Sequence, residues 1–144
     1  MRFRKFLKPY KTRGSSFREH TARERGGAEL IAAEFGIIDD FDKTKDYSVY
    51  EPERYHCVYI DDDLYIDDWW ARLVLMKTYF HCYSRPEFGL ARYGVTLIPP
   101  ESLPAFQEIV LSEPRLKEDP QLVLLAQLVQ KAVSEGKYMI HFGV

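Results

Sequence analysis

Length, composition and charge describe one ordinary globular domain. The chain has 144 residues, of which 46% are hydrophobic and 29% are charged, and these values exclude a wholly disordered protein. No run approaches the ~18–20 uncharged apolar residues that a membrane-spanning helix needs, and the basic start lacks the apolar core of a signal peptide. The sequence therefore predicts a cytoplasmic protein that does not enter a membrane.

Charge is distributed unevenly along the chain. Residues 1–25 contain nine Lys or Arg and two Glu, a net charge of +7, whereas residues 26–70 contain thirteen acids and three bases, a net charge of −10. Residues 71–144 are nearly balanced at +1. Such segregation bears on partners and solubility rather than on fold. We interpret residues 1–15 as a basic, mobile N-terminal arm and residues 16–144 as a single folded domain.

The first half of the chain predicts one helix and one strand. The spacing of apolar residues over 27–36 predicts a helix, which Gly36 would end in the left-handed conformation. Residues 39–53 are polar and predict a loop. Residues 55–60 are rich in β-branched and aromatic types, which predicts a strand that ends at three aspartates.

The segment 69–83 fits two descriptions. Asp67 and Asp68 would cap a helix at its start, and Asp68 forms a helical i,i+4 pair with Arg72. Polar residues do not fall on one helical face, however, and β-branched and aromatic residues crowd the second half. We therefore favour a strand over 72–83, while a helix over 69–83 stays open.

The second half of the chain has clearer boundaries. Residues 84–89 predict a turn, and residues 93–98 predict a strand that two prolines would end. Ser102 can cap a helix that runs to about Leu111, with a proline tolerated in its first turn.

The last two elements complete the predicted fold. Asp119 and Pro120 form an N-cap and first-turn pair for a helix that Gly136 would end, and residues 138–144 predict a final strand. Together the elements predict an α+β fold, an antiparallel sheet with helices packed on one face in two layers. The residues expected to share the core are Val58, Ile60, Leu97, Phe106, Ile109, Leu125, Val129 and Ile140.

The densest acidic run contains Asp61, Asp62, Asp63, Asp67 and Asp68. Carboxylates at this density can bind Mg²⁺ or Ca²⁺. The run lacks the central glycine and the terminal glutamate of an EF-hand loop, and runs of charge are more often solvated turns or partner-facing patches. We therefore expect no bound metal and no cofactor here.

Two His-Cys pairs, His56-Cys57 and His81-Cys82, offer the ligand types that zinc prefers. Neighbouring residues on a strand point to opposite faces, so each pair converges poorly on one ion. We interpret both cysteines as reduced and structural. The chain contains no G-x-S-x-G, no H-E-x-x-H and no glycine-rich phosphate loop, so we assign no catalytic residue. A small hydrolase or metal protein that uses these His, Cys and Asp residues stays open.

In overall build the chain resembles small bacterial immunity proteins, which neutralise polymorphic or contact-delivered toxins. The shared features are small size, an α+β layout, an acidic aromatic-rich segment and the absence of catalytic motifs. The segment from Gly94 to Ser102 is similar to a strand-to-helix transition in small uncharacterised bacterial proteins. The resemblance implies a non-enzymatic protein-binding module with a basic partner, such as a toxin nuclease domain, which an acidic patch would complement. The candidate partner-binding residues are Asp61, Asp62, Asp63, Tyr65, Asp67, Asp68, Trp69 and Trp70, with Tyr59 as a further aromatic anchor. The alternative is that both Trp are core residues and the aspartates form a capped turn.

The basic arm supports a different function, that of a nucleic-acid-associated accessory protein. Its cations could contact phosphates, and Phe3, Phe6 and Tyr10 could stack on bases. The chain carries no recognisable nucleic-acid-binding signature, and the arm could equally be a solubilising tail or dock on the acidic middle. We therefore favour protein binding. The arm's candidate phosphate contacts are Arg2, Arg4, Lys5, Lys8, Lys11 and Arg13.

Overall fold

The computed structural model describes residues 24–25, 28–29 and 31–144. The predicted arm and its cations therefore lie outside the described residues. The main strands are β4 (Ala32–Ile38), β5 (Val58–Asp61), β6 (Lys77–Phe80), β7 (Pro86–Phe88), β8 (Val95–Ile98) and β9 (Tyr138–Phe142). The α-helices are α2 (Asp67–Leu73), α3 (Leu103–Leu111) and α4 (Pro120–Glu135). A separate two-stranded pair joins β2 (Glu24–Arg25) to β3 (Ala28–Glu29).

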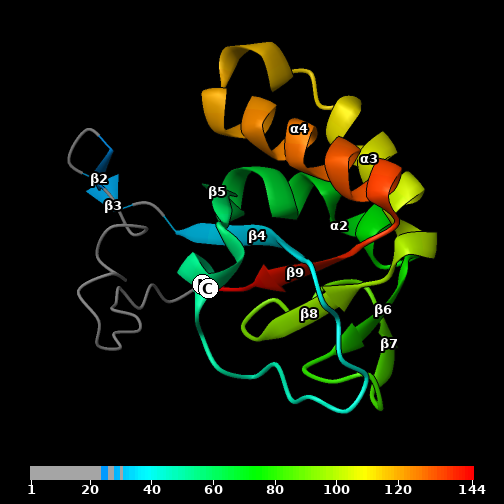
Figure 1. Cartoon of the computed structure of the whole chain (residues 1–144). Helices are drawn as coiled ribbons and strands as arrows, with labels where there is room; N and C mark the ends of the chain where they lie inside the picture. The colour runs from blue at the N-terminus through cyan, green and yellow to red at the C-terminus, as the bar shows by residue number, and fades with distance from the viewer. Residues whose placement is uncertain (1–23, 26–27, 30) are drawn as a thin grey trace.

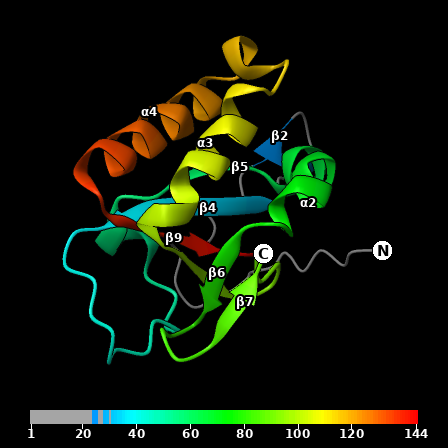
Figure 2. The same ribbon diagram turned by 90° about the vertical axis from the view of Figure 1, so that its right-hand side faces the viewer.

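The six main strands form one antiparallel sheet in the order β5-β4-β9-β8-β6-β7. The three α-helices cover one face of this sheet (Figures 1 and 2). The predicted α+β fold, with helices on one face of an antiparallel sheet, is confirmed. None of the described helices combines the length and the apolar character that crossing a membrane requires.

The helix predicted over residues 27–36 is wrong, because residues 32–38 form strand β4. This strand pairs with β5 on one edge and β9 on the other, and all seven of its residues are buried. A strand covered on both faces shows a continuous apolar run instead of alternation, so periodicity cannot distinguish it from a buried helix. Pairing on both edges decides the conformation here.

Gly36 permits a close approach and does not cap a helix. A Cβ atom at this position would lie 2.7 Å from both the Cβ and the carbonyl oxygen of Tyr55, and 2.8 Å from Sγ of Cys57. The missing side chain lets a short 3-10 helix, Pro52–Tyr55, pack against β4. The strand predicted over 55–60 is therefore confirmed only from Val58 onward.

The segment after β5 is helical. A π-helical stretch, Asp62–Ile66, runs directly into α2, and the Asp61 side chain accepts a hydrogen bond from the Leu64 N–H at 3.2 Å. The strand predicted over 72–83 is wrong for its first half and confirmed for β6. The buried residues of this segment follow helical spacing, at positions 62, 65, 66, 69 and 73. Because position 62 is an aspartate, these positions do not form a continuous apolar face in the sequence.

The second half of the chain follows the prediction more closely. The Asp119 side chain accepts a hydrogen bond from the Gln121 N–H at 3.0 Å, and Gly136 ends α4 with φ of 65°. Two details differ. The turn predicted over 84–89 contains β7, which pairs with β6. The Ser102 hydroxyl donates to the carbonyl oxygen of Lys77 at 2.7 Å instead of capping α3.

Apolar residues pack on both faces of the sheet. The helical face holds most of the predicted core, with Val58 partly buried beside it, whereas Leu97 and Ile140 point to the opposite face. That face is covered by the connection between β4 and β5, from which Tyr47 and Tyr50 pack inward. The predicted core therefore belongs to two layers separated by the sheet.

Candidate protein-binding surface

The acidic segment is fixed to the body by two arginines, the first of which is Arg92. Its Nε and Nη2 donate to Oδ2 of Asp62 at 3.0 and 2.8 Å, and Nη2 also lies 2.5 Å from Oδ1 of Asp67. The guanidinium carbon lies 5.2 Å from the ring centroid of Trp70, a cation–π contact. Burial alone would lower the pKa of Arg92, but the two carboxylates outweigh it and raise this pKa. Arg92 therefore stays charged and holds the π-helical stretch against the sheet.

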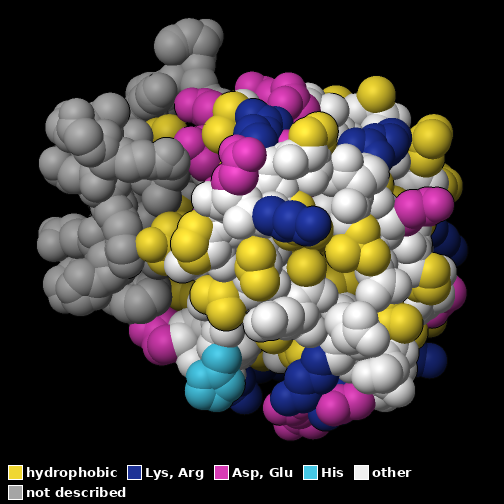
Figure 3. Space-filling view, turned by 90° about the horizontal axis from the view of Figure 1, so that it is seen from above, with side chains coloured by type: hydrophobic (Ala, Val, Ile, Leu, Met, Phe, Trp, Pro, Cys, Tyr) yellow, Lys and Arg dark blue, Asp and Glu magenta, His cyan; other side chains and the backbone are white. Residues whose placement is uncertain are grey.

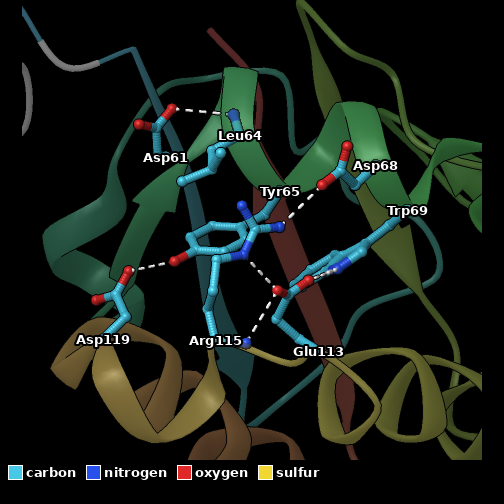
Figure 4. Close-up of polar contacts among 8 residues, drawn as sticks. All are labelled: Asp61, Leu64, Tyr65, Asp68, Trp69, Glu113, Arg115 and Asp119. Atoms are coloured by element: carbon cyan, nitrogen blue, oxygen red, sulfur yellow. Dashed lines mark hydrogen bonds and ion pairs between the residues drawn. The ribbon is translucent and has the colours of Figure 1, made fainter.

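The second arginine, Arg115, joins the same segment to the chain between α3 and α4 (Figure 4). It donates to Oδ2 of Asp68 at 2.8 Å and to Oε2 of Glu113 at 2.6 Å, and its guanidinium lies 4.9 Å from the Tyr65 ring centroid. The indole N–H of Trp69 donates to the other oxygen of Glu113 at 2.9 Å. One carboxylate thus connects a buried tryptophan to a surface ion pair.

The pKa values of Glu113 and Tyr65 in this network are shifted in opposite directions. Burial would raise the pKa of Glu113, but hydrogen bonds from Arg115 and Trp69 outweigh it and hold this pKa below its usual range. Burial raises the pKa of Tyr65, and so does the hydrogen bond that its hydroxyl donates to Oδ2 of Asp119 at 2.7 Å. At neutral pH the glutamate is therefore ionised and the tyrosine is neutral.

The structure separates the candidate partner-binding residues into two groups. Asp62, Tyr65 and Trp69 are at most 2% exposed and make the internal contacts described above, so their side chains belong to the core in this conformation. The sequence alternative, in which both Trp are core residues, holds for one of them. Exposed or half-buried positions remain for Tyr59, Asp61, Asp63, Asp67, Asp68 and Trp70.

Sequence reasoning missed the charged residues that hold the acidic segment in place. Arg92, Glu113 and Arg115 lie 30 to 50 residues away from their partners along the chain, and no local pattern connects them. One signal was available, because a helix that places an aspartate on its buried face needs a cation from elsewhere. The sequence indicates that a cation must lie near this aspartate, but it does not indicate which residue provides it.

A further missed residue is His141, which is 1% exposed on the helical face of β9. Its Nδ1 lies 3.2 Å from the hydroxyl of Thr96, which accepts the Ala91 N–H at 2.7 Å. In the part of the chain that the structure describes, Nε2 of His141 has no hydrogen-bond partner. Burial, with a smaller contribution from the charge of Arg92, lowers the pKa of His141 from 6.5 to about 3.

Acid should therefore destabilise the fold through His141. Because the folded-state pKa lies below the unfolded value, the unfolded chain binds the proton first, and stability is lost as pH falls from 6.5 toward 3. Between pH 7 and pH 5 the free energy of unfolding should fall by about 2 kcal/mol from this residue. Urea titrations across this range should show a much flatter profile for His141→Asn, which keeps an acceptor for Thr96. Parallel profiles for the two proteins would contradict the expectation.

The two His-Cys pairs do not come together in one cluster of ligands. Over the described ranges, no three His, Cys, Asp or Glu side chains are placed to hold one ion. Cys57 and Cys82 are both free thiols. Burial raises the pKa of the Cys57 thiol well above its ordinary value, which disfavours the thiolate that nucleophilic chemistry needs.

Comparison of the chain with protein-family models, with curated proteins and with solved structures returned no match.

Proposed function

We propose that this chain is a non-enzymatic protein-binding module whose partner is a basic protein. The observation that carries the proposal is the charge of the folded body, since residues 31–144 contain nineteen acids and eleven bases. An excess of eight negative charges speeds encounter with a basic surface and disfavours nucleic acid on the same body.

The acidic excess persists around the candidate surface even after its ion pairs are counted. Seven carboxylates and three arginines gather there, which leaves a net charge of −4. They are Asp61, Asp62, Asp63, Asp67, Asp68, Glu113, Asp119, Arg72, Arg92 and Arg115.

Rigidity also favours this surface as a binding site. Asp63, Asp67 and Asp68 are exposed on a segment whose other side is anchored by Tyr65 and Trp69. A side chain that is already held in one conformation loses less entropy when a partner binds. Leu64, 39% exposed on the same segment, offers an apolar contact among the charges.

The partner class follows from the resemblance to immunity proteins, which implies a toxin, such as a nuclease domain with a basic active site. The test is to express the gene that neighbours this one in the source genome, with and without this chain. Growth arrest by the neighbour alone, relieved by co-expression, would support the proposal. A neighbour that causes no arrest would count against the toxin partner.

Charge removal should slow the binding of this partner. Replacing Asp63, Asp67 and Asp68 together with Asn should reduce the association rate constant about tenfold at low salt, with a smaller change in dissociation. The difference should vanish at about 1 M salt, where the screening length is only ~3 Å. Surface binding kinetics at several salt concentrations would measure both constants.

A matched control changes the same charge elsewhere. Glu87, Glu101 and Glu108 are exposed and lie outside the candidate surface, so their joint replacement with Gln alters net charge equally. Equal slowing by both triple variants would show that only overall charge matters. No slowing by the Asp variant would remove this segment from the interface.

The net charge of +7 over residues 1–25 favours a second candidate, a nucleic-acid-associated accessory protein. Nucleic acid that co-purifies with the full chain, seen as absorbance at 260 nm and released by salt, would support it.

A further inference from the structure

An apolar groove lies on the outer side of the helical layer. Its volume is about 400 Å³, and it is formed by the end of α3, the 3-10 helix Leu116–Glu118 and the outward side of α4. Leu111, which lines it, is 54% exposed. The other lining residues are Leu116, Lys117, Val123, Ala126, Gln127 and Gln130.

The part of this face that α4 forms beside the groove carries no charge, whereas Lys117 lines the groove itself. From Pro120 to Gln130, eleven consecutive residues include no Asp, Glu, Lys or Arg, although 29% of the chain is charged. In Figure 3 hydrophobic side chains gather across the middle of the face, where a basic side chain also lies, and the acidic side chains gather toward its margins. The outward side of a solvated helix normally carries charged residues, whereas the centres of protein interfaces are depleted of them.

The distribution of charge favours a second copy of this chain as the occupant of the groove. Two copies of a body with nineteen acids and eleven bases repel each other wherever acidic faces meet. At the uncharged α4 face this repulsion is smallest, and leucine side chains can pack against leucine. Gln127 and Gln130 suit self-pairing as well, because each amide both donates and accepts hydrogen bonds. A basic partner would gain nothing here, because the groove lining contains no carboxylate and one lysine.

We propose that the α4 face is a self-association surface through which two copies of the chain pair about a two-fold axis. In such an isologous interface each residue near the axis meets its own copy. The groove lining contains none of the carboxylates of the acidic surface, so self-association and partner binding can be tested separately and either can fail alone.

A charge placed at Gln127 tests the symmetry directly. Gln127 is exposed in the middle of α4, and Glu and Lys are both good helix formers, so neither substitution endangers the fold. In a two-fold pair either charge meets a like charge, so Gln127→Glu and Gln127→Lys should each raise the dimer dissociation constant at least about tenfold. An equimolar mixture of the two variants should restore association. Sedimentation equilibrium of the full chain over a concentration series measures all of these.

A control variant separates a contact at α4 from a general effect of added charge. Ala71→Glu adds the same charge at an exposed position on α2 and should leave association unchanged. A wild-type chain that keeps the mass of one 16.9 kDa copy at all concentrations would overturn the proposal. So would a dimer that both Gln127 variants preserve, because the two-fold contact would then lie elsewhere.

Discussion

Replacing Arg92 with Met should lower the free energy of unfolding by about 3–5 kcal/mol, the range for removing one partner of a buried ion pair. The Asp62 side chain is 1% exposed and receives two hydrogen bonds from this guanidinium. Met has a similar stem, so packing against Trp70 is largely kept and the charge is what is lost. Urea denaturation at neutral pH measures the difference.

Two further variants separate the ion pair from general effects. Arg72 is exposed and, within the described part of the chain, donates to the hydroxyl of Ser112 at 2.8 Å, so Arg72→Met should cost no more than about 0.5 kcal/mol. Adding Asp62→Asn to Arg92→Met removes the buried charge and should recover part of the loss. A cost below about 1 kcal/mol for Arg92→Met would show that Asp62 is not held by this arginine.

Leu125→Ala should cost about 2–5 kcal/mol, the range for emptying a packed leucine site. Leu125 is fully buried between α4 and the sheet, whereas its neighbour Leu124 is 44% exposed. Leu124→Ala removes the same atoms from the same helix and should change stability by less than about 1 kcal/mol. Denaturant titrations of the two variants side by side measure the contrast.

Because Ala is a better helix former than Leu, helix propensity cannot account for a loss, and equal losses in the two variants would indicate that both leucines are packed to a similar degree. The comparison therefore tests the orientation of α4, in which Leu125 and Val129 are expected from the sequence to face the core. The same orientation places Gln127 on the outside of the helix, so a failure here would also remove the basis for the self-association surface.

Elements with local signals were predictable from sequence, and α4 is the clearest example. Asp119, Pro120 and Gly136 each act within one turn of the helix end, and the structure places all three in the expected roles. The residues of β4 carry no such signal, because their conformation depends on β9, about a hundred positions further along the chain. Long-range pairing of this kind overrides local preference.

The candidate site was likewise predictable only where the signal is local. The aspartates and aromatic residues of the acidic segment were visible in the sequence, but their burial was not. Whether Tyr65 faces solvent or Asp119 depends on where α4 docks, and the position of Arg115 depends on the turn that follows α3. Both features depend on how separate elements pack together, and the residue pattern of one segment does not predict that packing.

The position of β9 has a consequence for how this protein is made. β9 joins two half-sheets, β5-β4 on one side and β8-β6-β7 on the other, and it follows β8 by about forty residues. A ribosome adds ~5–20 residues per second, so both half-sheets leave it with unpaired edges several seconds before β9 arrives. The sheet therefore closes late in synthesis, through contacts between segments far apart in the chain. Until then the apolar run of β4 is open to chaperones and to other nascent chains.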